Sequence, residues 1–247
     1  GVGHIFLAGE APGLFYGYVT QGIVQKEDIT ENGIKYIKQD GSVGYYQTVN
    51  KTTPVAGDVK YVDRNGDGVV DDNDRDIIGN PNPDFTYGFQ TKVSWKSLSL
   101  SASFNGVQGR DILNVGNRYN NTPGTKSNNV TRKAFQNMWT DENPSNLYPK
   151  STFVVQNMVM DRYVEDGSYL RCSDITLSYV LPAKWTNKIG IKNTSVYASV
   201  KNAFVITDYS GYDPEVNSFA FDGLRPGVDM NSYPTPRSFV FGLNLTF

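Results

Sequence analysis

The chain has 247 residues and a mass of 27.4 kDa, with 38% hydrophobic, 13% aromatic and 19% charged residues. This content is too apolar and too aromatic for a disordered chain, and a net charge of -2 provides no basic surface for nucleic acid. No apolar run approaches the ~20 residues of a membrane-spanning helix, so a helical membrane protein is excluded. A β-barrel is still compatible with the mean hydropathy of -0.43, because its strands alternate apolar and polar residues.

The sequence contains one cysteine, Cys172, and one histidine, His4. A single cysteine excludes an intrachain disulfide framework, and we expect Cys172 to be a small buried residue. No Cys, Asp or Glu lies at ligand spacing from His4, and a Ser-His-Asp triad is not available. We therefore predict that the chain is not an enzyme. Because it starts at Gly1 without an initiator Met or a signal peptide, we expect it to be a piece of a longer protein.

The first part of the chain shows strand and turn signals. Residues 14–25 are rich in aromatic and β-branched residues and predict a strand interrupted by glycines. Residues 26–53 are polar, and the pairs Asn32-Gly33 and Asp40-Gly41 are strong turn signals. One or two short hairpins are expected there.

Residues 57–80 contain a motif that predicts metal binding. Within them, residues 63–74 fit the calcium loop of EF-hands, where oxygens at alternate positions of a curled backbone surround the ion. Gly68 stands where such a loop turns sharply. The expected ligands are Asp63, Asn65, Asp67, the carbonyl of Val69, Asp71 (directly or through water) and Asp74.

Two features of this motif depart from an EF-hand. Position twelve is Asp74 in place of the usual Glu, and its shorter side chain is expected to lower the affinity. The residues before the loop, 57–61, predict an extended segment and no helix, so a structural calcium ion is favoured over a signalling one. The alternative is an Asp/Asn/Gly-rich turn that binds nothing and is held by its own Asx turns.

Residues 85–106 predict the clearest hairpin of the chain, with a very tight turn at Lys96-Ser97. On the return strand, Leu98, Leu100, Ala102 and Phe104 share one face, and the other face carries serines and an asparagine. A soluble sandwich would show apolar residues inside and polar residues outside, but a face of serines also suits a water-filled lumen. Tyr87 and Trp95 are then candidate girdle residues at the two membrane interfaces.

Two long excursions interrupt the later strands. Residues 107–160 are too long for an ordinary connection, and residues 130–139 within them have helical spacing. Strands are predicted at residues 168–181 and 194–200, and a second excursion covers residues 207–233. Long loops on one side and tight turns on the other are typical of an outer-membrane barrel.

The last strand alternates from Ser238 to the end. Its apolar residues point to one face: Phe239, Phe241, Leu243, Leu245 and Phe247. A half-buried strand of a sandwich would alternate in the same way, whereas outer-membrane barrels end on such an aromatic-terminated strand with the apolar face against lipid. A sandwich would bury these side chains, and a barrel would leave them exposed.

Several blocks, in order along nearly the whole chain, resemble the C-terminal portion of SusC/RagA-type TonB-dependent outer-membrane transporters. They are FYGYVTQGI (15–23), GDVKYVDRNGDGVVDDNDRDIIGNPNPDFTYGF (57–89), FNGVQGRDILN (104–114), SYLRCSDITLSYVLP (168–182), KNAFVITDYSGYDPEV (201–216) and YPTPRSFVFGLNLTF (233–247). The resemblance is weakest at residues 26–50 and 115–161, in loops that vary with substrate.

The resemblance implies an all-β fold, an antiparallel transmembrane β-barrel of about 22 strands, of which residues 1–247 would form the C-terminal part with long extracellular loops. About 8 to 10 strands are expected here on usual strand lengths, and the N-terminal plug is absent from this chain. The implied location is the outer membrane of a Gram-negative, Bacteroidetes-like cell.

The implied function is import of glycan or peptide fragments, with a SusD-like surface lipoprotein over the mouth and TonB acting through the missing N-terminal part. The other implied partners are the remaining barrel strands, the plug and outer-membrane lipid. The loops 107–160 and 207–233 are the expected contacts for substrate or lipoprotein, and the calcium loop is expected on the extracellular side. The alternative is a secreted, calcium-stabilised β-sandwich for binding or adhesion.

Overall fold

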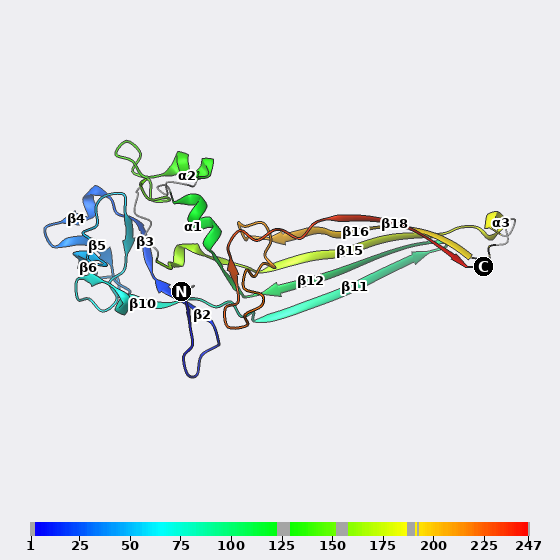
Figure 1. Ribbon diagram of the computed structural model, residues 1–247, viewed down its shortest axis with the longest axis horizontal. Helices are drawn as coiled ribbons and strands as arrows, with labels where there is room; N and C mark the ends of the chain where they lie inside the picture. Colours follow the sequence, from blue (N-terminus) through cyan, green and yellow to red (C-terminus); the bar gives the residue numbers. More distant parts are fainter. Residues whose placement is uncertain (1–2, 123–128, 152–157, 187–190, 192, 247) are drawn as a thin grey trace. The chain divides into compact units, whose positions relative to one another are not determined.

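The computed structural model describes residues 3–122, 129–151, 158–186, 191 and 193–246. The chain divides into two compact units, which we describe separately (Figure 1). The loop unit comprises Gly1–Asn82, Asp111–Glu165 and Val216–Ser232, and the sheet unit comprises Pro83–Arg110, Asp166–Glu215 and Tyr233–Phe247. None of the helices within the described ranges has the length and apolar character needed to cross a membrane.

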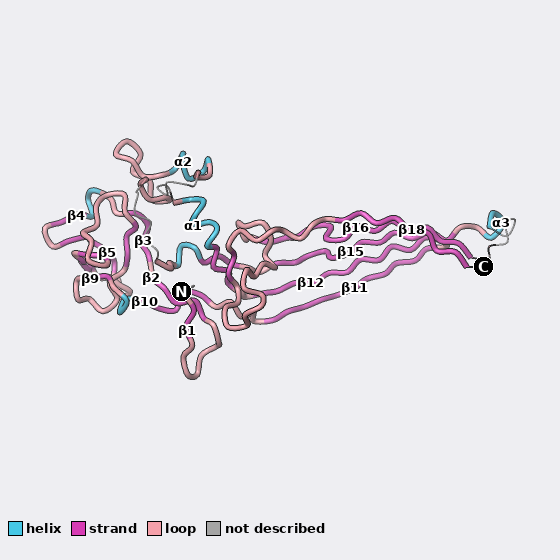
Figure 2. Tube along the Cα trace, viewed as in Figure 1, coloured by secondary structure: helices cyan, strands magenta, loops and turns pink. Residues whose placement is uncertain are grey.

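The sheet unit is built on one five-stranded antiparallel sheet in the order β11-β12-β15-β16-β18, whose long strands run side by side in Figure 2. The strands are β11 (Phe85–Trp95), β12 (Leu98–Gln108), β15 (Tyr169–Val180), β16 (Asn193–Thr207) and β18 (Ser238–Thr246). The predicted hairpin is confirmed: Trp95 pairs with Leu98 across the turn, and Lys96 takes a φ of 55° there. The short helix α3 (Ala183–Thr186) follows β15.

The two faces of this sheet differ as the alternation predicts. Along β18, Phe239 and Phe241 keep 66% and 79% of their surface exposed, and Leu243 and Leu245 are exposed as well. Large apolar side chains without cover on one sheet face are expected against lipid and not in a folded sandwich, which would bury them. The expectation for Phe247 lies outside the described residues.

Hydroxyl and amide side chains occupy the opposite face. Ser99, Ser101 and Ser103 of β12 pair directly with Ser178, Thr176 and Asp174 of β15. The Asp174 carboxylate accepts hydrogen bonds from the hydroxyls of Thr176 and Ser199, both at 2.7 Å. This face is therefore cross-linked by polar contacts and is suited to water.

Glycine stands opposite tyrosine at three cross-strand pairs: Tyr87 with Gly106, Tyr197 with Gly242, and Tyr36 with Gly44 in the loop unit. A Cβ atom at Gly242 would lie 2.2 Å from the Tyr197 ring, and one at Gly106 would lie 2.4 Å from the Tyr87 ring. The missing side chain lets each ring lie across the neighbouring strand, as aromatic residues do over glycines in sheets.

The count of long strands differs from the prediction. Of the 8 to 10 strands expected, the described residues form five long strands in one sheet, and the other strands are short and belong to the loop unit. β16 is longer than the predicted residues 194–200, because a bulge with Asn202 at a φ of 52° lets the strand continue to Thr207.

The loop unit contains several small sheets. They are β1 (His4–Ile5) with β2 (Leu14–Tyr18) and β10 (Arg75–Gly79); β3 (Thr20–Ile23) with β8 (Val59–Tyr61); β4 (Ile29–Thr30) with β5 (Gly33–Ile37) and β6 (Val43–Tyr46); β7 (Thr48–Val49) with β9 (Val69–Val70); and β14 (Val164–Asp166) with β13 (Asp111–Asn114) and β17 (Val228–Asp229). The helices are α1 (Val115–Asn121) and α2 (Arg132–Asn137), with 3₁₀ turns η1 (Lys26–Asp28), η2 (Asp72–Asp74) and η3 (Asp161–Tyr163). The predicted hairpins and helix are thus present, and the predicted strand 14–25 is two strands, β2 and β3.

The core of the loop unit is aromatic. Tyr18, Tyr36, Tyr46 and Tyr61 are almost fully buried in it. Each ring fills apolar volume while its hydroxyl finds a polar or sulfur partner, as buried tyrosines require. Tyr46, for example, accepts the backbone N–H of Tyr61 at 3.2 Å. Small sheets that are marginal alone are therefore held together by shared aromatic packing.

Candidate functional site

The predicted calcium loop connects β8 to β10 in the loop unit and contains β9 and η2. Gly66 and Gly68 have φ values of 76° and 86°, a backbone conformation that side chains disfavour. Gly68 is the residue at which the motif requires a sharp turn, so the backbone has the predicted shape at that position.

The carboxylate of Asp63 lies at the centre of the loop. Its two oxygens accept the backbone N–H groups of Gly66 at 2.7 Å and Gly68 at 2.8 Å, and its side chain is buried. Burial raises the pKa of Asp63; the two N–H groups oppose this shift, and the negative charges of Asp74 and Asp67 add to it. The buried Asp63 carboxylate, which lies close to other acids, is therefore stabilised by the dipoles of these two backbone N–H groups.

Asp74 closes the loop from its other end. It is fully buried, and its carboxylate accepts the backbone N–H groups of Arg64 at 2.8 Å and Asn65 at 3.3 Å through one oxygen, and of Asp71 at 2.8 Å through the other. The shorter side chain at position twelve thus reaches the backbone of position two, so the loop is drawn tight.

The remaining predicted side-chain ligands lie nearer the surface. The Asn65 amide donates to the Asp67 carboxylate at 2.9 Å, and each of these side chains also accepts the backbone N–H two residues ahead. The Asp71 side chain accepts the backbone N–H of Asn73 at 2.8 Å and caps η2. These are the Asx turns of the alternative interpretation. They do not preclude metal binding, because each carboxylate oxygen has a second lone pair.

The Val69 carbonyl was predicted as the main-chain ligand. At β9, the carbonyls of Gly68, just before the strand, and of Val70 accept the N–H groups of the two residues that flank the parallel strand β7, from Gln47 at 2.7 Å and Asn50 at 3.0 Å. Successive carbonyls of a strand point in opposite directions, so the Val69 carbonyl is directed away from β7.

Two buried tyrosines fix the loop to the core. The Tyr36 hydroxyl donates to the Asp63 carbonyl at 2.7 Å, and the Tyr18 hydroxyl donates to the Asp72 carboxylate at 3.1 Å. Burial raises the pKa of Tyr36 to about 12, and the charges of Asp63 and Asp74 contribute. Tyr36 is therefore a neutral donor at any physiological pH.

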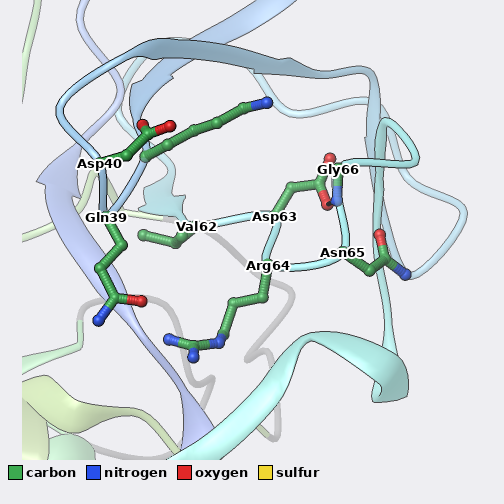
Figure 3. A pocket seen from close by; sticks show the side chains of 8 residues that line it. Gln39, Asp40, Val62, Asp63, Arg64, Asn65 and Gly66 are labelled. Atoms are coloured by element: carbon green, nitrogen blue, oxygen red, sulfur yellow. Dashed lines mark hydrogen bonds between the residues drawn. The ribbon is translucent and has the colours of Figure 1, made fainter.

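A pocket of about 280 Å³ opens beside the start of the loop (Figure 3). It is lined by Lys38, Gln39, Asp40, Val62, Asp63, Arg64, Asn65 and Gly66. Figure 3 shows the Asp63 carboxylate turned toward Gly66, whereas the Arg64 side chain points to the other side of the backbone. Within the described residues, no three acidic, histidine or cysteine side chains form a cluster that could hold a metal ion in this arrangement.

A second polar cluster, in the sheet unit, was not predicted. The Arg171 guanidinium of β15 forms a buried ion pair with Asp213 at 2.5 Å and lies 3.3 Å from Glu215. Asp213 also accepts the backbone N–H groups of Glu215 at 2.9 Å and Thr235 at 3.0 Å. The segment around Asp213 is thereby fastened to the polar face of the sheet.

Arg110 strengthens this attachment by donating to the Pro214 carbonyl at 2.5 Å. In the sequence, Asp213, Pro214 and Glu215 fall within the second predicted excursion, residues 207–233. The missed signal was an arginine on the polar face of a predicted strand, whose charge requires a partner when it is buried.

The comparisons with known proteins agree with this architecture. No family model matches the chain. The chain is 33% identical over 98% of its length to TonB-dependent receptor P3 of Formosa agariphila, and 34% identical over 76% of its length to TonB-dependent receptor SusC of Bacteroides thetaiotaomicron. The solved structure of the RagAB peptide transporter matches all of the chain with a TM-score of 0.69 at 25% identity. The chain belongs to the SusC/RagA-type TonB-dependent receptors.

The chain spans only part of these relatives, covering 23% of receptor P3, 17% of SusC and 24% of the matched RagAB chain. Its fold class is confirmed as antiparallel β-barrel strands, and the five long strands do not close a barrel by themselves. SusC/RagA-type receptors are outer-membrane proteins of Bacteroidetes, and the predicted location of the chain is confirmed.

Proposed function

We propose that the sheet unit forms part of the wall of an outer-membrane, TonB-dependent nutrient importer. The observation that supports this most is the contrast between the two faces of the five-stranded sheet. One face carries exposed Phe239, Phe241 and their apolar neighbours, and the other carries the serines of β12. A wall with lipid on one side and an aqueous passage on the other needs this arrangement. Import then consists of binding and gated passage, without covalent chemistry.

We further propose the partners and the substrate class. A SusD-like surface lipoprotein covers the mouth, and TonB acts through a plug outside this chain. The substrates are fragments of glycans or peptides: both classes are what the family resemblance implies, and a structural match is titled as a peptide transporter. The segments 107–160 and 207–233 are the proposed contacts for substrate or lipoprotein.

Uptake by intact cells tests this function. Cells that lack the gene, and cells that express it, are given labelled glycan oligomers and labelled peptides, with and without a protonophore. We expect energy-dependent uptake of at least one class only in expressing cells. Equal uptake by both cell lines for every oligomer tested would refute the importer assignment.

We propose that residues 63–74 bind a structural calcium ion. The supports are the turn at Gly68 and the buried acids Asp63 and Asp74. Asp63, Asn65, Asp67, Val69, Asp71 and Asp74 would hold the ion, which would neutralise the loop's negative charge.

Titration calorimetry of the full-length protein with calcium tests this site. The D63N variant should lose one binding event. D40N, which removes a carboxylate beside the same pocket but outside the loop, should keep it. An unchanged calcium stoichiometry in D63N would contradict the proposal and favour a turn held by Asx hydrogen bonds.

A further inference from the structure

A pocket of about 230 Å³ in the loop unit is not part of either site described above. Four segments that are distant in sequence form it: α1, α2, residues 147–149 and η3. Its polar and aromatic walls include Asn117, Asn121, Lys133, Tyr148, Arg162 and Tyr163. Pockets for drug-sized ligands start at about 300 Å³, so this one fits a single sugar ring or amino-acid residue of a larger oligomer.

Hydrogen bonds between the segments hold this pocket in shape. The Thr131 hydroxyl that caps α2 donates to the Asn121 side chain of α1 at 2.6 Å, so the two helices are tied together. The Trp139 backbone N–H donates to the Tyr148 carbonyl at 3.0 Å and fixes the extended segment. The Tyr163 hydroxyl lies 3.2 Å from that of Thr122. The walls are therefore organised before any ligand binds.

The charged side chains that line the pocket are both positive. Lys133 and Arg162 both line it, and none of the described lining residues is acidic. The Arg162 guanidinium donates to the Leu147 carbonyl and lies 5.8 Å from the centre of the Tyr163 ring, but it forms no ion pair with a described residue.

The two acids nearest to Arg162 in sequence accept hydrogen bonds from neutral groups. Asp161 accepts the hydroxyl of Thr20 at 2.6 Å together with its backbone N–H. Glu165 lies behind the pocket wall, where it accepts the amide of the lining residue Asn117 at 3.0 Å. Neither carboxylate forms an ion pair with Arg162.

Lys133 also lacks an ion-pair partner among the described residues. The sequence around it is basic: residues 115–163, from the start of α1 to the end of η3, contain six Lys and Arg residues against three acidic ones, although the whole chain has a net charge of -2. One of those three acids, Asp141, pairs with Lys26, and one of the cations, Lys150, pairs with Asp58. The positive charge of the pocket is thus not compensated by its own segment.

We propose that this pocket binds a carboxylate carried by the imported oligomer, with Lys133 and Arg162 as the charged contacts and the two tyrosines against the attached ring or side chain. A carboxylate matches a guanidinium and an ammonium group, and aromatic walls accept the apolar part of the same residue. The carboxylate comes either from an acidic sugar or from the free C-terminus of a peptide. This inference rests on the proposed import function, because it takes the ligand to be the imported oligomer.

Calorimetry on the full-length protein in detergent tests the proposal with two matched probe pairs. One pair is trigalacturonic acid and its methyl ester, and the other is N-acetyl-trialanine and its C-terminal amide. We expect the acid of at least one pair to bind about tenfold more tightly than its neutral counterpart, the usual value of a charged hydrogen bond. The pair that shows the preference identifies the source of the carboxylate.

Substitutions then locate the effect. K133Q should abolish the preference for the acid, and R162Q should do the same. R132Q is the matched control, because Arg132 is the adjacent exposed cation of α2 and does not line the pocket. The proposal is overturned if neither acid is preferred, if K133Q retains the preference, or if R132Q loses it as completely as K133Q.

The uptake assay keeps the two proposals distinguishable. If the protein binds the acid more tightly than its neutral counterpart, and this preference depends on Lys133, but cells take up no oligomer, the import function is refuted and the pocket assignment stands. Energy-dependent uptake by a protein with no acid preference would refute the pocket assignment alone.

Discussion

Replacing Asp213 by Asn should release the segment that the buried ion pair holds on the polar face of the sheet. The side chains of Arg171 and Asp213 are only 6% and 5% exposed, and 2.5 Å separates their charged atoms. Asn keeps the size of the side chain and an oxygen acceptor, so the lost quantity is the negative charge. Removing one partner of a buried pair costs about 3–5 kcal/mol, because the other charge stays buried without compensation.

Hydrogen exchange with mass spectrometry measures this release directly. At about 1.4 kcal/mol per factor of ten, the D213N change should raise the open population by roughly 100-fold or more in peptides covering residues 209–216. D222N is the control, because Asp222 pairs with Arg225 at 2.6 Å in a more exposed i,i+3 pair and contributes little. If D213N accelerates exchange no more than D222N does, the buried pair does not hold this segment.

The same pair gives the pH dependence a definite sign. Burial alone would raise the pKa of Asp213, but the backbone N–H groups of Glu215 and Thr235 and the charge of Arg171 outweigh it, so its pKa lies below the usual range. The stabilisation is present above the unfolded-state pKa of about 3.9 and is lost as the pH falls through the lower folded-state pKa. The protection factors of residues 209–216, which compare the observed exchange with the intrinsic rate at the same pH, should therefore fall below about pH 4 in the wild type and not in D213N.

Three further outcomes are expected. The Y36F change leaves the buried Asp63 carbonyl without its donor, which should lower the free energy of unfolding by about 1–3 kcal/mol in urea titrations. An unchanged free energy would mean that Tyr36 does not support the loop of residues 63–74. The G106A change should lower the free energy of unfolding by about 1–3 kcal/mol in the same assay, because its Cβ atom would lie 2.7 Å from a backbone oxygen. G88A is the control, since its Cβ atom would have its nearest contact at 3.4 Å. Equal effects of the two changes would contradict the close-approach explanation. Cys172 is fully buried, so maleimide should modify it in the urea-unfolded protein and not in the folded protein. Peptide mass mapping measures this labelling, and rapid labelling of the folded protein would contradict the burial of Cys172.

The sequence predicted the sheet unit well because its signals are local. Alternation along β11, β12 and β18 fixes which side chains share a face, and the two-residue turn at Lys96-Ser97 fixes the register of the hairpin. The same holds for the turn at Gly68, since a positive φ favours glycine wherever the fold places it.

What the sequence did not predict depends on contacts between distant residues. Arg171 and Asp213 are 42 positions apart, and the carboxylate-binding pocket combines helices with segments that carry no motif. The parallel pairing of β7 with β9 joins strands of two residues each, which are too short for any periodic signal. The aromatic core of the loop unit was not predicted for the same reason, because its tyrosines come from several strands that are too short for a periodic signal.

The insertion of residues 111–165 between two neighbouring strands has a consequence for the order of folding. β11 and β12 are joined by a two-residue turn, and such hairpins form within about 1–10 μs. β12 must then pair with β15, although the chain between them belongs to the loop unit. That pairing requires a long loop to close first, which makes it a slow, high-contact-order step. We therefore expect the β11–β12 hairpin to form early, with one edge of β12 unpaired. β15 pairs with that edge later, when residues 111–165 have become compact enough to bring it beside β12.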